Sequence, residues 1–198
     1  MENKLKELEN YAKENNIPIM EKEGIEFLTD YIKKHNVKNI LEIGSAIGYS
    51  AIKMALINNS INVTTIERDK SRYEEAVKNI NKFNLNNRIN IINKDALDIT
   101  LDNKYDLIFL DAAKGQYINF FNKFINNLNN NGVIITDDLL FHGMVEGNVI
   151  TLNRNTKQLI RKIKKYIEFL KNNKEFNTKF YKIGDGISIS KKVLIDKK

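Results

Sequence analysis

The stretch Asn39–Ala55, N-I-L-E-I-G-S-A-I-G-Y-S-A-I-K-M-A, decides the fold. Its apolar run at 40–43 is typical of a buried strand, which ends at Gly44, and a helical pattern begins after Gly48. Glycine lets the backbone turn tightly and approach a ligand, whose polar groups then meet the free N–H groups at the helix start. The stretch therefore predicts a strand, a glycine turn and a helix, with a ligand at the turn.

The spacing of the two glycines narrows the choice of ligand. Gly44-x-x-x-Gly48 differs from the Gly-x-Gly-x-x-Gly pattern that seats the pyrophosphate of a dinucleotide. A dinucleotide is therefore not the predicted ligand. Such a turn can also merely close a strand-to-helix connection. The residues that follow it must therefore show whether the turn binds a ligand.

Length and composition predict a single domain. The chain has 198 residues, of which 42% are hydrophobic and 29% charged, enough for one core spanning 1–198. Apolar stripes at 5–12 and 25–32 predict N-terminal helices within 1–35, before a core at 36–198. The absence of cysteine excludes disulfides and thiolate sites. With no signal-peptide pattern and no run of about 20 apolar residues, we expect a cytoplasmic protein without a membrane partner.

Acidic residues follow four of the predicted strands. Glu67 ends a strand at 61–66, and the others occupy equivalent positions in later segments: Asp95 after 89–92, Asp111 after 105–110, and Asp137 with Asp138 after 132–136. Carboxyl ends of parallel strands meet at the ligand-binding edge of an open α/β sheet, where such an acid can accept the hydroxyls of a ribose. The alternative for Glu67 is a helix cap, a role that Asp69 fits better.

Three of these carboxylates form a candidate metal site. Asp111, Asp137 and Asp138 offer hard oxygen ligands, which suit Mg²⁺ or a similar divalent cation. His142 follows closely, and we interpret it as a substrate-loop residue and not as a ligand. The alternative is that Asp137 and Asp138 form a solvated turn. Asp111, which follows another predicted strand in the equivalent position, favours the metal site.

The order of these motifs resembles a known family. The segments are L-E-I-G-S-A-I-G-Y-S, I-E-R-D, K-D-A, F-L-D-A-A-K-G-Q-Y and I-T-D-D-L-L-F-H-G. Together they resemble the cation-dependent class I S-adenosylmethionine O-methyltransferases of the catechol and caffeoyl-CoA type. The segments P-I-M at 18–20 and G-D-G-I-S-I-S at 184–190 are most similar to the bacterial tRNA 5-hydroxyuridine methyltransferases. The resemblance covers nearly the whole chain.

The resemblance implies a fold and a set of roles. The fold would be Rossmann-like α/β, with a seven-stranded, mainly parallel sheet, an antiparallel last strand and helices on both faces. The implied S-adenosylmethionine site consists of Met20, Gly44, Ser50, Glu67, Asp95, Ala96 and Asp111. The implied metal ligands are Asp111, Asp137 and Asp138, and the implied catalytic residues are Lys114, as general base, and Asp111. Family members are often dimers, so a homodimer is possible.

The chain departs from the family at one implied ligand. The family commonly has asparagine where this chain has Asp138. A third carboxylate adds negative charge to the site, which predicts a changed metal affinity or preference. The alternative for Lys114 is a solvated lysine at a helix start.

The last quarter of the chain bears on the substrate. Residues 1–150 hold 18 basic and 21 acidic side chains, whereas residues 151–198 hold 14 basic and 4 acidic ones. An amphipathic helix at 159–170 and a hairpin at 176–190 carry this excess, and Arg154 with the lysines near the C-terminus could follow a phosphate backbone. The predicted partner is tRNA at its anticodon region. A solvated face in a lysine-rich chain, a small catechol-type substrate and a non-catalytic tRNA-binding protein are the alternatives.

Overall fold

The computed structural model describes residues 2–147 and 151–193. In order, the elements are α1 (Glu2–Glu14), α2 (Lys22–Lys34), β1 (Asn39–Ile43), α3 (Tyr49–Ala55), β2 (Asn62–Glu67), α4 (Lys70–Lys82), β3 (Ile89–Asn93), η1 (Ala96–Asp98), β4 (Tyr105–Leu110), η2 (Lys114–Gln116), α5 (Tyr117–Phe124), η3 (Ile125–Asn127), β5 (Leu128–Thr136), α6 (Arg154–Asn172), β6 (Phe176–Tyr181) and β7 (Ile187–Lys192). Lys197 and Lys198, part of the predicted basic surface, lie outside the described residues.

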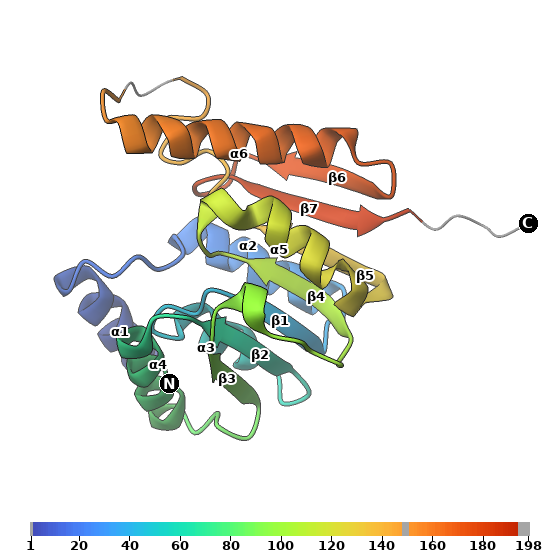
Figure 1. The fold of residues 1–198 in the computed structure, drawn as a ribbon. Helices are drawn as coiled ribbons and strands as arrows, with labels where there is room; N and C mark the ends of the chain where they lie inside the picture. Colours follow the sequence, from blue (N-terminus) through green and yellow to red (C-terminus); the bar gives the residue numbers. More distant parts are fainter. Residues whose placement is uncertain (1, 148–150, 194–198) are drawn as a thin grey trace, which may run out of the picture.

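The sheet has the predicted architecture (Figure 1). Within the described residues it contains seven strands in the order β3-β2-β1-β4-β5-β7-β6. Strands β1 to β5 pair in parallel, and β7 pairs antiparallel with both β5 and β6. The chain winds outward from β1 to β3 and then returns to place β4 on the other side of β1. This reversal opens a crevice at the carboxyl ends of β1 and β4.

Helices cover both faces of the sheet, as predicted (Figure 1). Because side chains alternate along a strand, Ile40 of β1 packs in the apolar cluster that includes α1 to α3, while Leu41 packs in the cluster with α5 and α6. Both side chains are fully buried. Two apolar layers therefore fix the sheet between the helices and leave its carboxyl edge open to a ligand.

The strand ends lie level with one another at that edge. Ile43 is in register with Ile66 and Leu110, and Leu110 is in register with Thr136. The ladder continues one residue further, because the Asp111 N–H donates to the Ile43 carbonyl and the Asp137 N–H donates to the Leu110 carbonyl, each at 3.1 Å. The residues that follow each strand therefore emerge side by side.

The boundary between α5 and β5 differs from the prediction, which has a helix as far as Leu128 and a strand from Gly132. The spacing of Tyr117, Phe121, Phe124 and Leu128 predicts a single helix, but α5 ends at Phe124, and Leu128 begins β5. Leu128 is buried in either arrangement, so its hydrophobicity does not distinguish them.

No helix in 2–147 or 151–193 is long and apolar enough to cross a membrane.

Candidate active site

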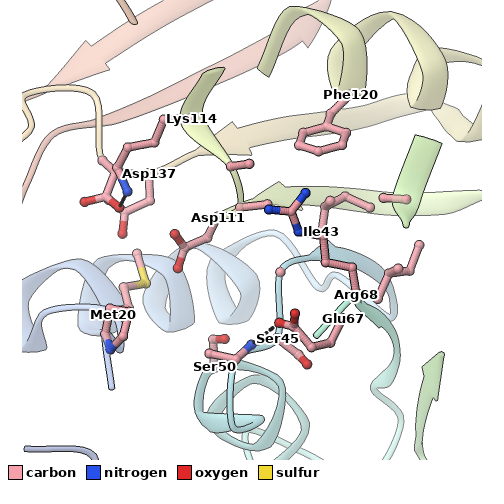
Figure 2. A pocket seen from close by; sticks show the side chains of 18 of the residues that line it. Met20, Ile43, Ser45, Ser50, Glu67, Arg68, Asp111, Lys114, Phe120 and Asp137 are labelled. Carbon is pink, nitrogen blue, oxygen red and sulfur yellow. Dashed lines mark hydrogen bonds and ion pairs between the residues drawn. The ribbon is translucent and has the colours of Figure 1, made fainter. Parts of the chain in front are cut away.

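A cavity of about 650 Å³ lies at the carboxyl edge of the sheet (Figure 2). It is bounded by the connection between α1 and α2 and by the segments that follow β1 to β5. Every residue to which the sequence assigned a site role lines it: Met20, Gly44, Ser50, Glu67, Asp95, Ala96, Asp111, Lys114, Asp137 and Asp138. The structure therefore brings the predicted site together in one place, and the individual roles stay predictions.

The glycine turn has no room for a side chain. Gly44 has a φ of +96°, and a Cβ there would lie 2.1 Å from the Asp111 carbonyl oxygen. Gly48, at the N-cap of α3, has a φ of +83°. Only glycine adopts such angles without strain, so the backbones of β1 and β4 approach closely and leave the space above the turn to the cavity.

Glu67 is held toward the cavity by two backbone groups. Its carboxylate accepts a hydrogen bond from the Ala46 N–H and another from the Asp69 N–H, both at 2.9 Å. Asp69 caps α4 by accepting from the Arg72 N–H at 2.9 Å, as predicted. Glu67 is therefore free of the capping role, and its fixed carboxylate keeps lone pairs for ligand hydroxyls.

Asp95 and Met20 come from distant parts of the sequence and both line the cavity. Asp95 caps η1 by accepting from the Leu97 N–H at 2.9 Å, and its other oxygen lies 3.8 Å from the Arg68 guanidinium. Met20 is buried, and its terminal methyl group packs against Gly24 of α2. An acid and a thioether thus line the cavity, in which Figure 2 shows Met20 together with Glu67.

Ser50 depends on a buried acid to which the sequence assigned no role. Its hydroxyl donates to Oε1 of Glu42 at 2.5 Å, while the Thr65 hydroxyl donates to Oε2 at 2.5 Å. Glu42 is fully buried in β1, and burial raises its pKa to about 7. The sequence could have indicated this role, because a glutamate lies within an apolar strand. An unpaired charge there would be costly, so partners for it are expected.

Glu42→Gln is expected to flatten the pH dependence of stability. In the wild type, the unfolded chain loses this proton near pH 4.5 and the folded chain near pH 7, so stability falls as pH rises between them. The full difference corresponds to about 3 kcal/mol at most. Urea unfolding of both proteins from pH 4 to 8 should show Glu42→Gln gaining relative stability up to pH 7. A constant difference across that range would contradict the assignment.

Lys114, Asp111, Asp137 and Asp138 all line the cavity, and Figure 2 shows the first three near one another. The Lys114 ammonium forms an ion pair with Asp138. Burial raises the pKa of Asp111 to about 7, an effect increased by Asp138 and opposed by Lys114. Burial and the charges of Asp111 and Asp138 raise the pKa of Asp137 to about 8. The carboxylates thus repel one another, and a cation among them would relieve that repulsion.

The chemistry of these groups suits a hard divalent cation. Oδ1 of Asp137 is buried and has no hydrogen-bond partner among the described residues, so an acceptor faces the cavity unpaired. The ligand set offers carboxylate oxygens only, which Mg²⁺ prefers. Within 2–147 and 151–193, however, no three Asp, Glu or His side chains are already arranged around a common metal position. The metal site therefore stays a prediction.

Comparison with known proteins gives the family. The sequence profile of the O-methyltransferase family matches residues 1–193. The chain belongs to this family. It is 27% identical over 176 residues to a caffeoyl-CoA O-methyltransferase from Populus kitakamiensis, covering 84% of this chain and 75% of the relative. It is also 27% identical over 191 residues to a flavonoid 3',5'-methyltransferase from Vitis vinifera, covering 90% and 79%.

Solved structures agree with this membership. A Staphylococcus aureus protein provisionally described as a caffeoyl-CoA O-methyltransferase is 38% identical, with a TM-score of 0.91 and coverage of 96% of this chain and 92% of that one. An O-methyltransferase from Bacillus cereus, solved in complex with SAH, shares the fold at 24% identity, with a TM-score of 0.82 and coverage of 96% and 91%.

This O-methyltransferase also has cavity residues that the sequence interpretation left without a role. Phe120 of α5, Phe141 and Asp185 all line the cavity, and the expected substrate-loop residue His142 lies beside them. Phe120 belongs to α5, where the helical spacing of Tyr117, Phe121 and Phe124 predicts core residues, and it is buried as Phe121 and Phe124 are. Asp185 lies in the turn between β6 and β7, far from the other acids in sequence. No spacing rule links such a turn to the cavity.

Proposed function

We propose that this protein transfers the methyl group of S-adenosylmethionine to the 5-hydroxyl of 5-hydroxyuridine at the wobble position of tRNA, forming 5-methoxyuridine with the help of Mg²⁺. The observation that carries the proposal is the shared cavity. The fixed carboxylate of Glu67 lies at one end, and Asp111, Asp137 and Lys114 lie at the other. A methyl donor and an oxygen nucleophile would thus be held next to each other, which supplies much of the rate in such a transfer.

The cofactor end matches an adenosyl group bearing a sulfonium. Glu67 offers acceptors for the two ribose hydroxyls, and the close approach at Gly44 leaves room beside the backbone. Ser50, fixed by its hydrogen bond to Glu42, presents a hydroxyl to the same compartment. Asp95 and Ala96 border the position proposed for the adenine.

The substrate end suits a hydroxyl with a second oxygen beside it. Mg²⁺, when bound by Asp111, Asp137 and Asp138, would lower the pKa of such a hydroxyl. As a neutral amine, Lys114 would then take the hydroxyl proton, which requires its ammonium first to leave the ion pair with Asp138 and to release a proton to solvent. In 5-hydroxyuridine the two oxygens are O5 and O4, and a catechol offers an equivalent pair.

The exposed face of α6 favours an RNA over a small molecule. Arg154, Lys157, Arg161 and Lys165 are exposed, and their spacing of three or four residues places them on one side of the helix. Lys162 lies against Gly115 in η2, next to Lys114. A row of cations that reaches the catalytic end of the cavity would contact phosphates and position an RNA.

A small catechol-type substrate is the second candidate. The names of the plant relatives favour it, since they describe methylation of caffeoyl-CoA and of flavonoids. The same cavity groups would serve either substrate, because both present neighbouring oxygens. The basic face of α6 would then have no role in the reaction.

Transfer of labelled methyl groups tests the proposal. Wild-type enzyme is incubated with labelled S-adenosylmethionine, Mg²⁺ and tRNA containing wobble 5-hydroxyuridine, and the digested nucleosides are identified by mass spectrometry. We expect labelled 5-methoxyuridine, with no label in matched tRNA that carries unmodified uridine. Chelation of the metal should remove the signal, and Mg²⁺ should restore it.

Two other outcomes of this assay would favour the alternative functions. Rapid labelling of free catechols without labelling of the tRNA would favour the small-molecule enzyme. Tight binding of tRNA without any methyl transfer to tRNA or catechols would favour a non-catalytic binding protein.

A further inference from the structure

The loop that follows β5 is hydrogen-bonded to the turn between β6 and β7. The Leu139 N–H donates to the Gly186 carbonyl at 3.0 Å, and the Leu140 N–H donates to the Asp185 carbonyl at 2.7 Å. Gly186 permits this contact, because a Cβ there would lie 2.5 Å from Cγ of Leu140. The hairpin therefore sets the path of the loop that continues from Asp137 and Asp138.

The loop places two side chains at the cavity through an uncommon backbone conformation. Phe141 and His142 have φ values of +48° and +55°, a region that residues other than glycine adopt rarely. Both side chains line the cavity, and the Lys114 ammonium lies 5.7 Å from the centre of the Phe141 ring. Strained residues of this kind gather at ligand-binding positions, where the surrounding contacts hold them in place.

Asp185 is hydrogen-bonded to the backbone of His142 and lies beside its ring. Oδ1 accepts from the His142 N–H at 2.5 Å, and Oδ2 lies 3.3 Å from Nδ1 of the imidazole. The Asp185 side chain is only 6% exposed, whereas the His142 side chain is 66% exposed. The backbone hydrogen bond to a buried carboxylate thus fixes the position of His142, and the same carboxylate lies beside Nδ1, so Nε2 is the ring nitrogen left for a ligand.

We propose that His142, positioned by Asp185, binds a phosphate group of a nucleotide substrate at the mouth of the cavity. This inference rests on the proposed function and specifies how the substrate is held. A base that enters the cavity leaves its phosphates outside, where the acids Asp111 and Asp137 do not reach them and His142 is exposed. When the imidazole carries both protons, one N–H faces Asp185 and the other donates to the phosphate.

Substrates with and without phosphate test this role. Kinetics are measured with 5-hydroxyuridine and with its 3',5'-bisphosphate, for wild type and His142→Asn. Asparagine tolerates the positive φ, so the loop conformation is kept. We expect His142→Asn to reduce the preference in KM for the bisphosphate by about tenfold, with kcat for the bisphosphate nearly unchanged. Asp185→Asn should reduce the same preference less, because it keeps the acceptor for the His142 N–H.

The chain offers a matched control and a second readout. It contains two histidines, and His35 is exposed at the end of α2 and does not line the cavity. His35→Asn should leave the preference unchanged. In NMR spectra, uridine 5'-monophosphate should shift the ring signals of His142 and not those of His35, while uridine shifts neither. An equal loss for both substrates, or no shift of His142 with the monophosphate, would overturn the inference. Absence of turnover with every hydroxyuridine substrate would instead refute the proposed function, and the NMR titration would still decide on His142.

Discussion

Asp137→Asn is expected to lower kcat/KM by at least about 100-fold, because it removes the charge of a proposed metal ligand, and even the contacts that support a metal ligand are usually worth 10- to 100-fold in metal affinity. Oδ1 of Asp137 is one of the buried oxygens without a hydrogen-bond partner among the described residues, and it belongs to a side chain that lines the proposed metal site. The amide keeps the shape of the side chain and removes its charge. Activity and Mn²⁺ binding, followed by calorimetry, should therefore fall together.

The same substitution is expected to stabilise the metal-free protein. The pKa of Asp137 is about 8 when folded against an ordinary value of 3.8, so the unfolded chain releases this proton first. Stability of the wild type accordingly falls as pH rises from about 4 to 8, by on the order of a few kcal/mol. Asparagine does not titrate, and it also ends the repulsion by Asp111 and Asp138.

Thermal unfolding in a chelator separates these effects. At pH 8 the Asp137→Asn protein should unfold at a higher temperature than wild type, and the two should converge toward pH 4. Asp102→Asn, a change of one exposed carboxylate, serves as the control and should alter neither activity nor stability. Full activity of Asp137→Asn with Mg²⁺ would contradict the assignment of Asp137 as a ligand.

The sequence was enough to predict this edge of the sheet because each acid directly follows an apolar run. Once β1, β4 and β5 are known to be parallel neighbours, Asp111 and Asp137 must emerge together at the carboxyl edge of the sheet. The predicted cap at Asp69 was confirmed for a similar reason, since capping depends on residues within one turn.

Contacts between distant segments could not be predicted in this way. Asp185 meets the backbone of His142 across 43 positions of the sequence, and the contact depends on how the β6–β7 turn packs on the loop after β5.

The early end of α5 could not be predicted for another reason. Leu128 fits the apolar face of a helix and the buried start of a strand equally well, so periodicity alone does not choose.

Lys114→Met is expected to reduce kcat by about 10²- to 10⁴-fold, the range typical of a lost general base. Binding of S-adenosylmethionine, measured by calorimetry, should stay close to wild type, because the contacts proposed for its ribose lie at Glu67. Methionine preserves the unbranched side chain beside Phe141 while removing the amine and its ion pair with Asp138.

Two further variants separate a proton-transfer role from a purely electrostatic one. Lys114→Arg keeps the positive charge, but a guanidinium does not give up its proton in proteins, so the variant should be nearly as slow as Lys114→Met. Lys162→Met removes a neighbouring cation that packs against Gly115 and should leave kcat within about threefold of wild type while raising KM for tRNA, as expected for a cation that contacts phosphates and takes no part in proton transfer. If Lys114→Arg retained most of the activity, the side chain would act by its positive charge. Another group would then have to accept the proton of the substrate hydroxyl.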